Sequence, residues 1–173
     1  SDSPESLDAY SMEVYAEDLR ALLDEVGAEV CALIGCSFGG MVALQFATSR
    51  PERVAALVAS DSSPAYDHPG YGDAFGERER RITAMAEVVR TRGPAAIGKQ
   101  AAASVKDPFL AEGIRRRYRA LDRDGFLGAE SARRLRPDLT PLLRDRLTMP
   151  VLLCWGGDDP VISAREVMVA ELP

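Results

Sequence analysis

Histidine is nearly absent from this sequence: its 173 residues include one, His68. A lone histidine without a cluster of other ligands argues against a metal enzyme. The three cysteines form no CxxC pair and fall in or beside stretches that we expect to be buried strands (Cys31, Cys36 and Cys154). An odd number of buried thiols suits a reducing compartment. We therefore expect no metal and a cytoplasmic location.

Long apolar runs are also absent. No stretch approaches the roughly 20 apolar residues that a membrane-spanning helix needs, and no secretory signal peptide is recognisable. The basic residues form no stripe with interleaved aromatic residues, because helical spacing would spread Arg115, Arg116 and Arg117 around their helix. The formal net charge is −6. We therefore expect neither a membrane nor a nucleic acid as partner, and a single globular domain with a core of its own.

The most informative stretch is residues 30–41, VCALIGCSFGGM. The apolar run Val30–Ile34 is too short for a helix and has no polar alternation, which predicts a strand buried on both faces. From Phe38 onward, apolar residues recur at helical spacing. Ser37 is therefore predicted to lie on a strand-to-helix turn.

The glycines around Ser37 have a physical reason. A strained serine backbone lifts the hydroxyl clear of the sheet edge, and we expect a side chain at Gly35 or Gly39 to crowd the turn. The amide of Phe38, at the start of the helix, would then point at a developing oxyanion. A G-x-S-x-G pattern in this context predicts a nucleophilic serine.

Several segments resemble the α/β-hydrolase superfamily. Residues 35–40, GCSFGG, are similar to the family's nucleophile elbow, and residues 10–23 to the helix before it. Residues 50–58, RPERVAALV, resemble the link into the next strand, and residues 149–160, MPVLLCWGGDDP, the acid-bearing strand and loop. The resemblance leaves residues 64–146 loosely matched. It implies an α/β protein: a partial α/β-hydrolase fold with three parallel strands, flanking helices and a helical cap insertion.

Three parts of the chain follow from this interpretation. Residues 1–63 would form the first part of the hydrolase core, with a helix capped by Ser11, the nucleophile strand and its helix, and a second strand. Residues 64–146, which Gly and Pro break into short Arg-rich helices, would form the helical cap. Residues 147–173 would complete the core with the acid-bearing strand, its loop and the start of another helix.

The resemblance also implies roles for single residues. Ser37 would be the nucleophile, the backbone amide of Phe38 an oxyanion donor, and Asp159 the acid that orients a histidine. Asp61 stands where some members of the superfamily carry the acid, but we expect a turn or cap role for it. His68 precedes the acid, whereas the family's histidine follows the last strand, so we expect a loop residue or one that lines the cap entrance.

The general-base histidine and the second oxyanion donor match no residue of this sequence. Because the chain starts at Ser1 and stops at Pro173, soon after a helical pattern begins, we expect an interior piece of a longer protein that supplies both. This piece alone should be inactive. Bare sheet edges would also favour association into a homo-oligomer.

The resemblance and these residues predict a serine hydrolase that acts on a carboxylic ester, lactone or related acyl substrate through an acyl-enzyme and that needs no cofactor. A C–C bond hydrolase or a cofactor-free haloperoxidase of the same superfamily stays open, as does a non-catalytic ligand-binding protein with this fold. An unrelated α/β domain that binds phosphate at residues 35–40 is disfavoured, because the stretch has neither the Lys-Ser/Thr of a P-loop nor G-x-G-x-x-G.

Overall fold

The computed structural model describes residues 3–71, 74–156, 168–170 and 172. Contacts divide the chain into two compact units. The helical unit comprises Ser1–Tyr10 and Gly76–Ala132, and the sheet unit comprises Ser11–Phe75 and Arg133–Pro173. The sequence analysis divided the chain by expected role, into a core (1–63, 147–173) and a cap (64–146). The two units defined by contacts do not test those roles, so that division stays a prediction.

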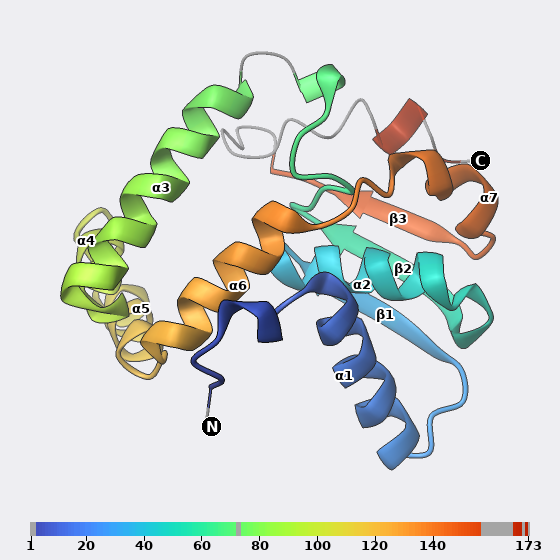
Figure 1. Ribbon diagram of the computed structural model, residues 1–173, viewed down its shortest axis with the longest axis horizontal. Coiled ribbons are helices and arrows are strands. Elements are labelled where there is room, and N and C mark those ends of the chain that lie inside the picture. Colours follow the sequence, from blue (N-terminus) through green and yellow to red (C-terminus); the bar gives the residue numbers. More distant parts are fainter. Residues whose placement is uncertain (1–2, 72–73, 157–167, 171, 173) are drawn as a thin grey trace. The chain divides into compact units, whose positions relative to one another are not determined.

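The described part of the sheet unit contains a parallel sheet with strand order β1-β2-β3 (Figure 1). Its strands are β1 (Cys31–Cys36), β2 (Val54–Ser60) and β3 (Val151–Cys154). The register pairs Cys36 with Ser60 and Ser60 with Cys154. The three strands therefore end side by side at one edge of the sheet, with β2 in the middle. The predicted α/β class and the parallel βαβ unit are confirmed.

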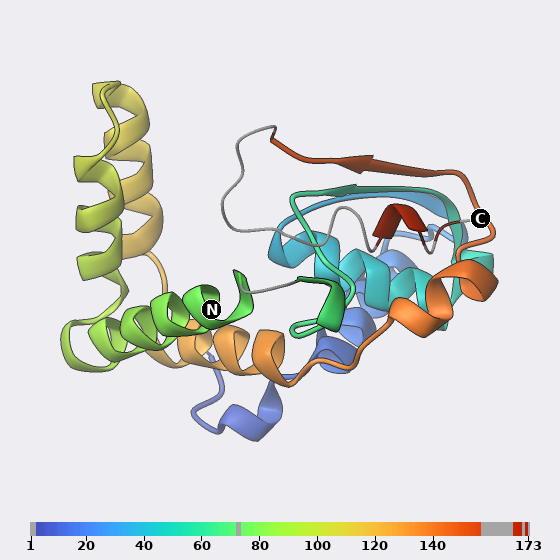
Figure 2. The ribbon, with the colours of Figure 1, turned by 90° about the horizontal axis from the view of Figure 1, so that it is seen from above.

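Helices α1 (Met12–Glu25), α2 (Phe38–Ser49) and α7 (Leu143–Arg146) pack on one face of this sheet (Figure 2). Helix α2 contacts β1 and β2 on one side and α1 and α7 on the other, which explains why Leu44 and Phe46 are fully buried. The Oγ of Ser11 caps α1 by accepting a hydrogen bond from the Val14 amide (3.2 Å), as predicted. Gly27, at φ 70°, closes the helix.

The expectation that the first strand is buried on both faces is wrong. Along β1, Leu33 and Gly35 are buried, whereas the side chain of Ile34 is 81% exposed. The described helices α1, α2 and α7 lie on one face, and side chains that point to the other face are exposed in the described part of the chain (Figure 2). Cys36 is exposed for the same reason, which corrects the prediction of a buried thiol there.

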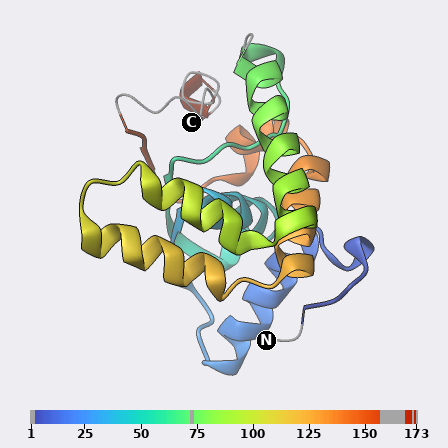
Figure 3. The same ribbon diagram turned by 90° about the vertical axis from the view of Figure 1, so that its left-hand side faces the viewer.

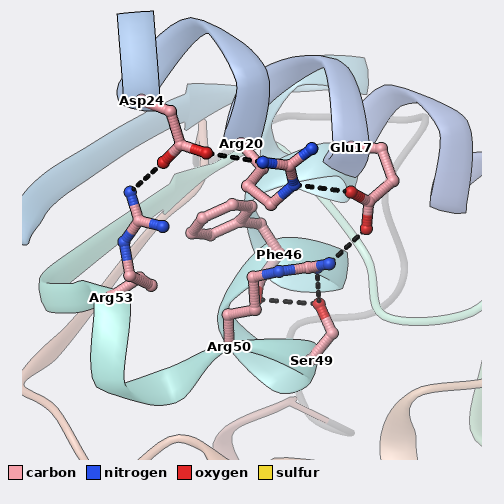
Figure 4. A network of polar contacts seen from close by, with 7 residues as sticks. All are labelled: Glu17, Arg20, Asp24, Phe46, Ser49, Arg50 and Arg53. Carbon is pink, nitrogen blue, oxygen red and sulfur yellow. Dashed lines mark hydrogen bonds and ion pairs between the residues drawn. The ribbon is translucent and has the colours of Figure 1, made fainter. Parts of the chain in front are cut away.

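A network of ion pairs ties α1 to the segment that precedes β2 (Figure 4). Arg20 contacts both Glu17 and Asp24 within α1. Arg50, at the end of α2, pairs with Glu17, and Arg53, in the 3₁₀ turn Pro51–Arg53, pairs with Asp24 at 2.8 Å. The hydrogen bond from Arg20 holds the pKa of the Glu17 carboxyl below its ordinary value, and the bond from Arg53 does the same to the pKa of Asp24.

The helical unit contains α4 (Pro94–Ala103) and α5 (Pro108–Arg119), and also most of α3 (Ala74–Arg92) and α6 (Arg123–Leu135). Helices α4 and α5 pack side by side as a hairpin (Figure 3). The two helices approach closely at Gly98, which has no side chain. A Cβ at this position would overlap the Tyr118 side chain. The expectation that Gly and Pro break this stretch into separate helices is confirmed for the described residues. None of the helices that the structure describes is both long and apolar enough to cross a membrane.

Candidate functional site: the turn between β1 and α2

Ser37 connects β1 to α2 and has a backbone conformation that L-residues rarely adopt. Its φ is 53° and its ψ −116°, and the residue is exposed. The Ser37 amide donates a hydrogen bond to the Ser60 carbonyl oxygen (2.8 Å), and the Ser37 carbonyl oxygen accepts one from the Ser62 hydroxyl (3.1 Å). Such a conformation costs about 1–3 kcal/mol and persists when the surroundings fix it. Here the end of β2 fixes it.

The glycines beside Ser37 differ in their surroundings. A Cβ at Gly35 would overlap the Gly39 carbonyl, as predicted, and a Cβ at Gly40 would lie 2.6 Å from the Ser62 Cβ. At Gly39 the prediction of crowding is wrong, because nothing described lies within 4 Å of a Cβ there. Both glycines lie in the first turn of α2, but Gly39 is exposed, whereas Gly40 is buried against Ser62, two residues after β2. The sequence analysis missed the packing role of Gly40.

Phe38 is the first residue of α2, so its amide belongs to the helix turn whose N–H groups have no intrahelical partner. Its ring meets the Tyr15 ring edge-on, with centroids 5.0 Å apart and planes at 87°. This contact anchors the start of α2 to α1. The role of the Phe38 amide as an oxyanion donor stays a prediction.

Asp61 follows β2 directly and has a positive φ of 46°, which agrees with the expected turn position. Its carboxylate accepts hydrogen bonds from the Ser60 hydroxyl (2.8 Å) and from the amide of Gly156 (3.1 Å), just after β3. No sequence signal linked Asp61 to Gly156, because the two are far apart in the chain. The predicted acid, Asp159, lies outside the described residues, so its role stays a prediction.

His68 lies in the loop before the 3₁₀ turn Pro69–Tyr71. Its Nδ1 accepts a hydrogen bond from the Gly70 amide (3.0 Å), and its ring centroid is 5.4 Å from that of Tyr71. An accepting Nδ1 places the proton of the neutral ring on Nε2. Within the described part of the chain, no group of three His, Cys, Asp or Glu side chains is placed to hold a metal ion.

The alpha/beta hydrolase fold family model matches residues 1–170 of the chain. The chain belongs to this family. Over 107 residues it is 36% identical to the sn-1-specific diacylglycerol lipase ABHD11 of Mus musculus, a match that covers 61% of this chain and 34% of the lipase.

Solved structures of hydrolases resemble this chain over nearly its whole length. A thermophilic esterase from Thermogutta terrifontis is 30% identical with a TM-score of 0.74, and the match covers 94% of this chain and 61% of the esterase. The enol-lactonase from Burkholderia xenovorans LB400 has a TM-score of 0.81 at 17% identity, over 99% of this chain and 64% of the lactonase, and this likeness shows the fold alone. The chain thus spans about a third of the curated lipase and under two thirds of these solved chains.

Proposed function

We propose that this chain carries the nucleophile of a serine hydrolase that acts on a carboxylic ester, lactone or related acyl substrate. The observation that carries the proposal is the exposed Ser37 on a backbone of positive φ, held by Ser60 and Ser62. Strained backbone conformations of this kind occur preferentially at functional sites, where they hold a reactive group in place. Similarity to a lipase and an esterase supports the ester class.

In the proposed reaction, the Ser37 Oγ attacks the carbonyl carbon of the substrate while its proton passes to a histidine that the rest of the protein supplies. The carbonyl oxygen becomes an oxyanion, to which the Phe38 amide donates a hydrogen bond. Asp159 accepts a hydrogen bond from the histidine and holds it in the productive tautomer. Collapse of the intermediate expels the alcohol, which takes the proton. Water then attacks the acyl-enzyme by the same route and releases the acid and the Ser37 hydroxyl.

The test uses the full-length protein on a panel of p-nitrophenyl esters and simple lactones. We expect Ser37→Ala to lower kcat by about 10⁴-fold or more, as loss of a triad nucleophile does. Ser104→Ala is the matched control, because Ser104 is an exposed serine at the end of α4. A fluorophosphonate probe followed by peptide mass spectrometry should label Ser37.

Two results would contradict the proposal. Full activity in the Ser37→Ala variant would place the nucleophile elsewhere. A full-length protein that neither turns over any ester or lactone nor reacts with the probe would favour the non-catalytic ligand-binding alternative.

A further inference from the structure

The turn at the end of β2 contacts the start of the loop that follows β3. We propose that Asp61 is a positioning residue that fixes the start of the loop after β3 at Gly156, three residues before the predicted acid Asp159. This inference rests on the proposed function for its effect on catalysis. It rests on the described contacts of Asp61 for the positioning itself.

Asp61 holds the end of β3 through both its backbone and its side chain. Its amide donates a hydrogen bond to the carbonyl oxygen of Cys154, the last residue of β3 (2.8 Å). Its Oδ1 accepts a hydrogen bond from the amide of Gly156 (3.1 Å). The backbone bond to Cys154 is the last one of the β2–β3 ladder, whose register pairs Ser60 with Cys154. The bond from Gly156 to the Asp61 side chain therefore adds one fixed point beyond the ladder. The backbone of Asp61 thus holds Cys154, and the side chain of Asp61 holds Gly156.

The carboxylate of Asp61 is itself oriented. Its Oδ2 accepts a hydrogen bond from the Ser60 hydroxyl (2.8 Å), and the residue is half-buried. The φ of 46° turns the chain out of the strand direction, and Asp and Asn are the side-chain-bearing residues that tolerate this region best. A charged acceptor also strengthens the hydrogen bond from an amide relative to a neutral acceptor. The residue type therefore suits both the turn and the contact with Gly156.

The neighbours of Asp61 hold the Ser37 turn. Ser60 accepts the hydrogen bond of the Ser37 amide, and Ser62 donates to the Ser37 carbonyl. One tripeptide, Ser60–Ser62, thus contacts the proposed nucleophile on one side and the strand that leads to the predicted acid on the other. Because proton transfer in a triad depends on the relative placement of its members, a shift of this tripeptide would change the chemistry.

Three substitutions in the full-length protein separate the roles of Asp61. Asp61→Asn keeps an oxygen acceptor and tolerates positive φ, Asp61→Gly tolerates the conformation without an acceptor, and Asp61→Ala does neither. We expect Asp61→Asn to retain most of the activity. Asp61→Gly and Asp61→Ala should lower kcat by about 10²-fold with little change in KM, the size of effect that a misplacement of about 1 Å produces.

The pH profile distinguishes positioning from a general loss of structure. A histidine that loses a well-placed carboxylate binds its proton less tightly, so the acidic limb of kcat/KM should move to lower pH in the Gly and Ala variants. A fall in Tm with unchanged kcat and pH profile would overturn the proposal. Loss of activity in Asp61→Asn equal to that in Asp159→Asn would also overturn it, because Asp61 would then be the triad acid.

Hydrogen exchange at the Gly156 amide tests the contact without any activity. We expect faster exchange in Asp61→Gly and Asp61→Ala than in the wild type, and near-wild-type protection in Asp61→Asn. If Ser37 proves dispensable, the proposed function fails, and this exchange pattern still decides whether Asp61 holds the loop start. Equal exchange at Gly156 in all four proteins would refute the positioning role.

Discussion

The Ser62 hydroxyl donates a hydrogen bond to the carbonyl oxygen of Ser37 at 3.1 Å, although the two residues lie on different connections of the sheet unit. Ser62 is 1% exposed, so the donor side of this bond is buried. The Ser37 turn is therefore held from the end of β2 and not only by its own flanking residues. This hydrogen bond can form only because α2 packs closely against the segment that follows β2.

Adjacent glycines of α2 should respond to substitution in opposite directions. Gly40→Ala places a methyl group 2.6 Å from the Ser62 Cβ and should destabilise the protein by about 1–3 kcal/mol. Gly39→Ala meets nothing described within 4 Å and should stabilise α2 by about 0.5–1 kcal/mol. Chemical denaturation of both variants measures the difference. Equal effects of the two substitutions would show that the contact with Ser62 does not limit the position.

The backbone of Ser37 should store measurable strain. Ser37→Gly relieves the penalty of positive φ, whereas Ser37→Ala keeps a Cβ in the same conformation. We expect the Gly variant to be more stable than the Ala variant by about 1 kcal/mol, since non-glycine residues in such regions cost about 1–3 kcal/mol. The midpoints of urea unfolding compare the two, and both variants should lack activity. A Gly variant less stable than the Ala variant would argue against stored strain.

Acid should weaken the network around α1. The arginines lower the pKa values of Glu17 and Asp24, so the folded state releases these protons more readily than the unfolded state does. The resulting stabilisation is fully present at neutral pH. It disappears as the pH falls through the ordinary carboxyl range towards the lowered values of the folded state. Arg53→Met should therefore reduce the loss of Tm between neutral and acid pH.

The matched control for this prediction is Arg80→Met, because Arg80 pairs with Glu77 on an exposed face of α3. Its Tm curve should run parallel to that of the wild type. High salt should shrink the Arg53 effect, since Glu17 and Asp24 are accessible to solvent and exposed ion pairs are screened. A wild-type curve and an Arg53→Met curve that stay parallel at every pH would contradict the role of these ion pairs.

The order of strands and helices was predictable because each depends on local pattern. Apolar runs between Gly and Pro mark β1, β2 and β3, and Ser11 and Gly27 mark the ends of α1. Burial of β1 was mispredicted because an apolar residue such as Ile34 does not reveal which face of a sheet is covered. Which face of the sheet is covered by helices depends on segments elsewhere in the chain.

The details of the candidate site depend on contacts that sequence spacing does not contain. Gly39 and Gly40 are chemically identical, and only the phase of α2 relative to the end of β2 makes one open and the other crowded. The contact of Asp61 with Gly156 joins residues 95 positions apart. Ser37 was found because its signal is local, whereas Ser62 and Asp61 act across the sheet.

The two ends of strand β2 make different kinds of contact. Arg53, immediately before its first residue, donates hydrogen bonds to the Ala28 and Glu29 carbonyl oxygens and pairs with Asp24. At the other end, Ser60 and Ser62 hold the Ser37 turn. At about 3.3 Å per residue, the seven residues of β2 place these ends about 20 Å apart. We therefore expect one library of substitutions around Arg53 to alter thermal stability, and a second library around Ser60 and Ser62 to alter the proposed hydrolase activity. The two libraries can be combined, since changes at that separation add.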